Sequence, residues 1–196
     1  MKPIRLLLLD FDGTLADTRR ANALAYVQTL AEVGYTLTEE AYLKHYFGVR
    51  CNEFLTRIGI ADPAERERLR LRKIALYPTF FASVRLNRPL WEFARQFRRE
   101  GGKVWIVSTG SRQNFTNVMR HLGLGIAGES DQAPEGVVDG VLSGEEVREG
   151  KPSPEAFLEV MRREGCTPEE CLIFEDSEVG LEAARRSGAA YIQVKF

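Results

Sequence analysis

Apolar residues are distributed along the chain in two patterns, short continuous runs and longer stretches with helical periodicity. The runs at 4–9 (interrupted only by Arg5), 104–107 (preceded by Lys103) and 171–174 lack polar–apolar alternation, which is typical of strands buried on both faces of a parallel sheet. The stretch 191–194, apolar except for Gln193, predicts a last strand. Because helical segments separate these runs, right-handed crossovers would join them into one parallel sheet. The pattern predicts an α/β fold with helices on both faces of the sheet.

One long segment contains only helical patterns. Residues 19–33 have helical periodicity and are followed by Gly34, and Asp62-Pro63 is a typical helix start. Nothing between 19 and 81 predicts a strand. We therefore expect a helical subdomain, 16–85, inserted into an α/β core that comprises 1–15 and 86–196.

The rest of the core is predicted to alternate helices with turns. Helices are expected over 90–99 and 114–122, and Ser153-Pro154 and Ser177 are suited to open two more. The segment 123–150 is rich in glycine and acidic residues, and its Asp-Gly pair at 139–140 predicts a tight hairpin between two short strands.

Composition narrows the classes of partner. The chain has 196 residues, of which 44% are hydrophobic and 28% charged, enough apolar material for a real core. A formal net charge of −1 offers no general attraction to nucleic acid or to anionic membranes, so small molecules are the expected partners. No stretch approaches the roughly 20 apolar residues of a membrane span. The first apolar run reaches Asp10 without a signal-peptide cleavage site, and three cysteines without CxxC spacing suit reduced thiols, so we expect a cytoplasmic protein.

Functional groups follow three of the predicted strands. Asp10 and Asp12 end the first run, Ser108 ends the second, and Glu175-Asp176 end the third. The carboxyl ends of parallel strands share one edge of the sheet, where ligands bind in such folds. Two neighbouring carboxylates raise each other's pKa unless a cation or hydrogen bonds compensate, and paired acids suit Mg²⁺, which prefers oxygen ligands.

Four motifs occur in order along the chain: DFDGTL at 10–15, Ser108 after its strand, GKPSPEAF at 150–157, and EDSEVGLEAA at 175–184. Together they resemble the motifs of the haloacid dehalogenase superfamily, a group of mostly Mg²⁺-dependent phosphohydrolases. The resemblance covers nearly the whole chain. It implies a Rossmann-like core of three layers with an inserted helical cap, here 16–85.

The resemblance also implies a mechanism. Asp10 would attack phosphorus and form an aspartyl-phosphate, while Asp12 would protonate the leaving oxygen and then activate water. Mg²⁺ would be held by the Asp10 carboxylate, the backbone carbonyl of Asp12 and Asp176, with Glu175 as a direct or water-mediated ligand.

The second and third motifs would bind the transferring phosphoryl group. Ser108 would hydrogen-bond the phosphate, with the backbone N–H groups of Thr109 and Gly110 completing the cradle. Lys151 would balance the charge of the phosphoryl group and the nucleophile.

The position of the cap in the sequence indicates the type of substrate. Its placement resembles that in phosphoglycolate phosphatases, other sugar-phosphate phosphatases and β-phosphoglucomutase. Many of these relatives carry a histidine where this chain has Asn22, and in the mutase that histidine helps to steer the chemistry, so its absence favours a plain phosphatase. Arg50 is a candidate ligand for a second anionic group of the substrate, although a solvated arginine explains it as well. Arg70 and Lys73 are weaker candidates.

We therefore expect an Mg²⁺-dependent phosphatase acting on a small phosphomonoester of the phosphoglycolate or sugar-phosphate type. A β-phosphoglucomutase-like enzyme and a non-catalytic binding protein on the same fold remain alternatives. A dehalogenase is excluded because such relatives lack the second acid, here Asp12, and a dinucleotide-binding domain is disfavoured because no GxGxxG follows the first strand. The sequence determines neither the ester nor the oligomeric state.

Overall fold

A computed structural model describes residues 2–129 and 136–196. Part of the predicted segment 123–150, residues 130–135, therefore lies outside the described residues. The chain divides into two compact units, one made of 1–17 and 86–196 and the other of 18–85.

The first unit is built on a five-stranded sheet in the order β7-β4-β1-β8-β9. All neighbouring pairs are parallel. The strands are β1 (Leu6–Leu9), β4 (Lys103–Val107), β7 (Gly140–Leu142), β8 (Cys171–Glu175) and β9 (Ala190–Gln193). The four leucines of β1 are completely buried, as expected for the central strand of a sheet covered on both faces. The predicted α/β class is confirmed.

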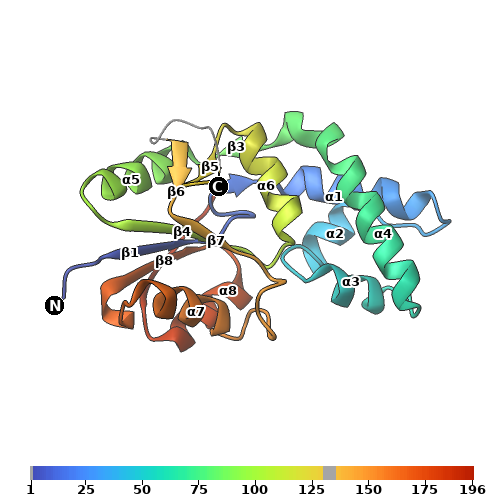
Figure 1. The fold of residues 1–196 in the computed structure, drawn as a ribbon. Helices are drawn as coiled ribbons and strands as arrows, with labels where there is room; N and C mark the ends of the chain where they lie inside the picture. The colour runs from blue at the N-terminus through green and yellow to red at the C-terminus, as the bar shows by residue number, and fades with distance from the viewer. Residues whose placement is uncertain (1, 130–135) are drawn as a thin grey trace. The chain divides into compact units, whose positions relative to one another are not determined.

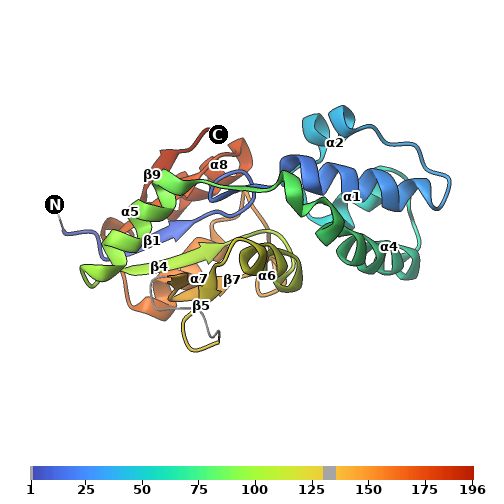
Figure 2. The same cartoon turned by 90° about the horizontal axis from the view of Figure 1, so that it is seen from above.

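Helices cover both faces of this sheet (Figure 1). On one face lie α7 (Glu155–Glu164) and α8 (Glu178–Ser187), whose apolar side chains share a core with Leu6, Leu8 and Ile173. On the other lie α5 (Arg88–Arg99) and α6 (Arg112–His121), and Figure 2 also shows α5 lying over the sheet. Phe93 of α5 packs against Phe174 with ring centroids 5.8 Å apart. Alternate residues of each strand therefore serve two separate cores.

The smaller elements complete this unit. They are β2 (Ala16–Asp17), which pairs with β3 (Arg85–Leu86) where the chain leaves and re-enters the core, β5 (Gly125–Ile126), β6 (Val137–Val138) and a 3₁₀ turn at Pro168–Glu170. In the part of the chain that the structure describes, no helix is both long and apolar enough to cross a membrane.

The hairpin predicted at Asp139-Gly140 is wrong. The strand before it, β6, pairs with β5, whereas β7 pairs with β4 in the main sheet. The Asp139 carboxylate instead accepts hydrogen bonds from Arg98 Nε (3.1 Å) and from the backbone N–H of Val104 (2.9 Å). A β-carbon on Gly140 would come within 2.5 Å of the Trp105 ring. The Asp-Gly pair therefore attaches β7 to β4, because tertiary contacts satisfy both residues better than a local turn would.

The second unit is helical, as its sequence pattern predicts. It comprises α1 (Arg19–Ala31), α2 (Glu39–His45), α3 (Cys51–Arg57), α4 (Pro63–Leu76) and a 3₁₀ helix at Tyr77–Ser83. The helix α1 lies between α2 and α4 (Figure 2). The core of this unit is aromatic: the centroid of the Tyr26 ring lies 4.9 Å from that of Phe54 and 5.1 Å from that of Tyr42. Asp62 caps α4 by accepting from Ala64 N at 3.1 Å, as the Asp-Pro start predicts.

Candidate active site

The turn after β1 presents two carboxylates on the same side. The backbone N–H of Asp10 donates to the Phe174 carbonyl (2.9 Å) and so continues the ladder between β1 and β8. Phe11 is completely buried and its ring lies 5.9 Å from that of Phe115 on α6. With Phe11 buried in the core, the turn leaves Asp10 and Asp12 at the edge of the sheet, where Asp12 Oδ2 lies 3.4 Å from the Ser108 hydroxyl.

Lys151 reaches this edge from the loop between β7 and α7. Its Nζ lies 2.5 Å from Asp10 Oδ1 and 2.5 Å from Glu175 Oε2, and its side chain is only 4% exposed. Burial alone would lower the pKa of Lys151, but attraction to Asp10 and Glu175 outweighs burial and holds the pKa above its ordinary value. The ammonium group therefore stays charged between two carboxylates from different strands.

The loop that carries Lys151 is shaped by Glu155, whose importance the sequence did not reveal. The Glu155 carboxylate accepts from the backbone N–H groups of Arg148 (3.0 Å) and Glu149 (2.9 Å). A residue at the start of α7 thereby holds the segment immediately before Lys151. The motif around 150–157 contains Glu155, but nothing in its type shows which backbone groups it binds.

Three acids can offer oxygen atoms to one cation. Asp10, Glu175 and Asp176 each place a carboxylate oxygen within 4.8 Å of the others, the one such cluster among residues 2–129 and 136–196. Burial raises the pKa of Asp10 well above its ordinary value, with repulsion from Glu175 and Asp176 adding and attraction to Lys151 opposing. A β-carbon on Gly13 would fall 2.3 Å from Asp176 Oδ2, so only glycine leaves room for this carboxylate. Crowded, dehydrated carboxylates of this kind fit a hard divalent cation.

Glu175 is the most constrained of these acids. Its Oε1 accepts from the Ser177 hydroxyl (2.8 Å), from Ser177 N (3.0 Å) and from Asp176 N (3.1 Å), while Oε2 binds Lys151. Ser177 also caps α8 by accepting from Gly180 N at 3.1 Å, as predicted. In the structure both oxygens of Glu175 are thus engaged by protein groups. Its role as a metal ligand stays a prediction.

The end of β4 brings Ser108 to the same edge. Its N–H donates to the Leu142 carbonyl (3.0 Å), and its hydroxyl lies 3.4 Å from Asp12 Oδ2. The backbone N–H of Gly110 donates to this hydroxyl at 3.1 Å. The predicted phosphate cradle of Ser108, Thr109 and Gly110 therefore includes one N–H that already holds the serine in place.

The helical unit contains the other candidates. Arg50 is half-buried at the N-cap position of α3, and Arg70 pairs with Glu67 at 2.7 Å. The contacts described for these two arginines lie within the helical unit, and their contact with substrate stays a prediction.

Lys73 is buried within the helical unit, a placement that its sequence pattern did not predict. It is 3% exposed, and its Nζ lies 2.6 Å from Asn22 Oδ1. The same ammonium lies 3.7 Å from the Tyr77 ring centroid and 5.1 Å from that of Tyr26. Asn22, which stands where many relatives have histidine, therefore accepts a charge-assisted hydrogen bond from Lys73. Unlike a histidine, its amide stays neutral at every pH.

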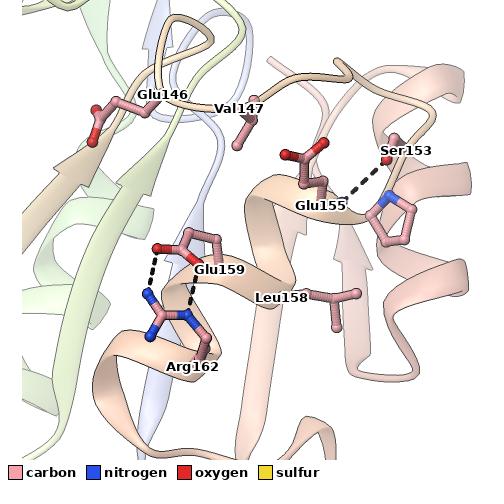
Figure 3. Close-up of a pocket in the computed structure, with 8 residues that line it drawn as sticks. Glu146, Val147, Ser153, Glu155, Leu158, Glu159 and Arg162 are labelled. Carbon is pink, nitrogen blue, oxygen red and sulfur yellow. Dashed lines mark hydrogen bonds and ion pairs between the residues drawn. The ribbon is translucent and has the colours of Figure 1, made fainter.

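A hollow of about 570 Å³ lies elsewhere, beside α7 (Figure 3). Its lining residues belong to α7 and to the preceding loop: Glu146, Val147, Ser153, Pro154, Glu155, Leu158, Glu159 and Arg162. None of the carboxylates or hydroxyls at the sheet edge lines it. Arg162 binds Glu159 in Figure 3, and Glu155 accepts from backbone N–H groups outside the lining, so these charged groups are already engaged and the chemistry points to the sheet edge instead.

Comparison with known proteins agrees with this geometry. The family model described as haloacid dehalogenase-like hydrolase matches residues 7–194. A fructose-1-phosphate phosphatase of Escherichia coli, YqaB, is 27% identical over 193 residues, covering 97% of this chain and 96% of its own. A phosphorylated carbohydrates phosphatase of Thermotoga maritima is 27% identical over 188 residues, covering 93% of this chain and 81% of its own.

Solved structures show the same architecture. The crystal structure of CbbY from Rhodobacter sphaeroides in complex with phosphate matches with a TM-score of 0.81 at 26% identity. The match covers 98% of this chain and 87% of that one. Two independent kinds of comparison, of sequence and of structure, thus extend over nearly the whole chain.

Proposed function

Because this chain belongs to the haloacid dehalogenase-like hydrolase family, we propose that it is an Mg²⁺-dependent phosphatase that hydrolyses a small phosphomonoester through an aspartyl-phosphate. The observation that carries the proposal is the position of Lys151, which lies 2.5 Å from Asp10 and 2.5 Å from Glu175. This contact would hold Asp10, as the nucleophile, in place beside the two other acids, Glu175 and Asp176. A non-catalytic binding protein would not need a buried lysine and three crowded carboxylates at one sheet edge.

Asp10 would act as the nucleophile. Its carboxylate would attack phosphorus, so that one difficult displacement becomes two easier ones. Lys151 would favour the ionised form of Asp10, opposing the effect of burial on its pKa, and would stabilise charge on the transferring oxygens. Mg²⁺ would be held by Asp10, the backbone carbonyl of Asp12 and Asp176, with Glu175 nearby, and when bound it would offset the repulsion between carboxylate and phosphate.

Asp12 would move the protons. It would give a proton to the leaving oxygen in the first step and take one from the attacking water in the second. Ser108, 3.4 Å from Asp12 Oδ2, would orient this carboxyl group when no substrate is bound and then donate to the phosphate. Thr109 and Gly110 would complete the binding of the phosphate through their backbone N–H groups.

The substrate would be a small phosphorylated metabolite. Two relatives are named as phosphatases of fructose 1-phosphate and of phosphorylated carbohydrates, and the CbbY structure holds phosphate. A further relative, 26% identical over 193 residues, is named a phosphoglycolate phosphatase, so both sugar phosphates and phosphoglycolate belong to the proposed substrate class. Arg50 would contact a second anionic group of the substrate, with Arg70 and Lys73 as weaker candidates.

The test is release of phosphate from p-nitrophenyl phosphate and from a panel of sugar phosphates and phosphoglycolate, with Mg²⁺ and with EDTA. We expect turnover that requires Mg²⁺ and falls at least about 10³-fold in Asp10→Asn, because that variant has no nucleophile. Circular dichroism should show that the variant is folded. Turnover retained by folded Asp10→Asn would contradict the nucleophile assignment.

The same panel separates the alternative enzyme. Isomerisation of a hexose 1-phosphate that needs only a catalytic amount of bisphosphate would identify a mutase instead. Absence of both reactions from folded protein supplied with Mg²⁺ would favour a binding protein.

A further inference from the structure

The completely buried Thr14 is hydrogen-bonded to one of the acids at the sheet edge. Its Oγ1 lies 3.1 Å from Asp176 Oδ1, although the two residues are 162 positions apart. A hydroxyl has one proton to donate, and a carboxylate can only accept, so Thr14 is the donor. On its other side the Asp176 carboxylate lies against Gly13. The turn after β1 thus restricts Asp176 by a contact and by a directed hydrogen bond.

Thr14 is itself held by Asn87, where the chain returns to the α/β unit. The side-chain Nδ2 of Asn87 donates to the Thr14 carbonyl (3.1 Å), and its backbone N–H donates to the Leu15 carbonyl (2.8 Å). Its Oδ1 accepts from Leu90 N (3.3 Å) and so caps α5. One residue therefore fixes the turn after β1 to the first turn of α5.

We propose that Thr14 and Asn87 are positioning residues for Asp176 and that, acting in series, they set the affinity of the site for its divalent cation. This inference rests on the proposed function, in which Asp176 is a metal ligand. Asp176 lies close to two other carboxylates, which would repel it toward solvent. The Thr14 hydroxyl opposes that movement by holding Asp176 Oδ1.

The physical reason is preorganisation. A ligand side chain that is already held in one rotamer loses less conformational freedom when the metal binds. Outer groups of this kind typically change metal affinity about 10- to 100-fold when they are removed. Asn87 acts one step further away, through the peptide of Thr14, so its effect should be smaller.

The first experiment measures Mg²⁺ binding without substrate, by isothermal titration calorimetry of the full chain. Thr14→Val removes the hydroxyl at nearly constant shape and should weaken binding about 10-fold, whereas Thr14→Ser keeps the hydroxyl and should stay within about threefold of the unaltered protein. Thr29→Val is the matched control, because Thr29 is 1% exposed and its hydroxyl donates within α1 to the Ala25 carbonyl. It should leave binding unchanged.

The outcomes are distinct. If Thr14→Val binds Mg²⁺ as tightly as the unaltered protein does, the inference is overturned while the proposed function stands. If the unaltered protein binds no Mg²⁺ at millimolar concentrations, both are overturned. In activity assays Thr14→Val should need more Mg²⁺ for half-maximal rate but reach nearly the same kcat at saturation, which a general loss of structure would not produce.

The second experiment tests whether Asn87 acts on Asp176 through Thr14. Asn87→Ser keeps a side-chain oxygen to cap α5 but loses the amide donor to Thr14, and should weaken Mg²⁺ binding about threefold, below the usual range for groups one step closer. Adding it to Thr14→Val should cause almost no further loss, since both act through the same hydrogen bond. Asp62→Ala, which removes the cap of α4, controls for loss of a helix cap. Equal losses from Asn87→Ser in both backgrounds would overturn the series.

Discussion

At the scale of single residues, the Glu175 carboxylate fits the site only because the residue packed against it is a glycine. Gly180, in the first turn of α8, lies against the Glu175 carboxylate, and a β-carbon there would fall 2.0 Å from Glu175 Cδ. Helix geometry fixes the direction of that β-carbon, so the carboxylate would have to move. Glu175 binds Lys151, so the space left by Gly180 also determines the position of the lysine.

Gly180→Ala is therefore expected to reduce activity. Alanine favours helix by up to about 1 kcal/mol, but overpacking against a buried side chain typically costs about 1–3 kcal/mol, so the clash should outweigh the propensity. We expect kcat/KM to fall by about 10-fold or more, as for outer groups at metal sites, and urea unfolding to show a net loss of stability. Val179→Ala, at a neighbouring position that is 44% exposed, should change neither quantity appreciably. Unchanged kcat/KM in Gly180→Ala would argue against this packing.

At the scale of elements, side-chain caps at helix termini and ion pairs along the helices stabilise the secondary structure. Asp62, Thr38 and Ser177 cap their helices as their residue types predict. Along α7, Glu159 accepts from Arg162 Nε (2.8 Å) and from Arg163 Nε (2.8 Å). Hydrogen bonds from Arg162 and Arg163 lower the pKa of Glu159 to about 2 from its ordinary value of 4.5. This cluster of one half-buried glutamate and two exposed arginines supports the helix that begins beside the Lys151 loop.

The lowered pKa of Glu159 predicts a dependence of stability on pH. A carboxyl group whose pKa falls on folding contributes stability that is complete above its unfolded value, 4.5, and is lost as the pH falls toward its folded value of about 2. The Tm of the unaltered protein should therefore exceed that of Glu159→Gln at pH 6, and the difference should shrink between pH 4.5 and 2. A difference in Tm that is the same at pH 6 and pH 3 would contradict the assignment. Because both arginines are exposed to solvent, high salt should reduce the difference at pH 6.

At the scale of the whole molecule, the site joins distant parts of the chain within one unit. Asp10 follows β1 and Asp176 follows β8, and these strands are neighbours in the sheet. A cation bound by both would act as a cross-link that exists only in the folded state. Metal binding should therefore stabilise the protein by mass action.

We expect Mg²⁺ to raise Tm in a concentration-dependent manner and EDTA to reverse the increase. At a Mg²⁺ concentration 100 times Kd, binding should add about 2.7 kcal/mol to the free energy of unfolding. Differential scanning calorimetry would measure it, with NaCl of equal ionic strength as the control. Asp176→Asn should lose most of the response because it weakens the cross-link. A response to Mg²⁺ no larger than that to NaCl would mean that the acids at the sheet edge do not hold the ion.

The sequence by itself determined the class of fold, the helical nature of the inserted segment, expected at 16–85, and the sheet edge at which Asp10, Ser108 and Asp176 meet. It could do so because continuous apolar runs separated by helices imply a parallel sheet, and parallel strands end together. Caps such as Asp62 and Ser177 were predictable for a similar reason, since each binds a backbone group only a few residues away.

Only the tertiary structure decided which groups touch across the chain. Lys151 binds Asp10 across 141 positions, Thr14 binds Asp176 across 162, and Lys73 binds Asn22 across 51. The predicted hairpin at Asp139-Gly140 was wrong for the same reason, because Asp139 binds partners on α5 and β4 rather than its own neighbours. Local patterns determine backbone conformation and burial, whereas the partner of a buried charge or hydroxyl depends on which distant side chain packing brings within hydrogen-bond distance.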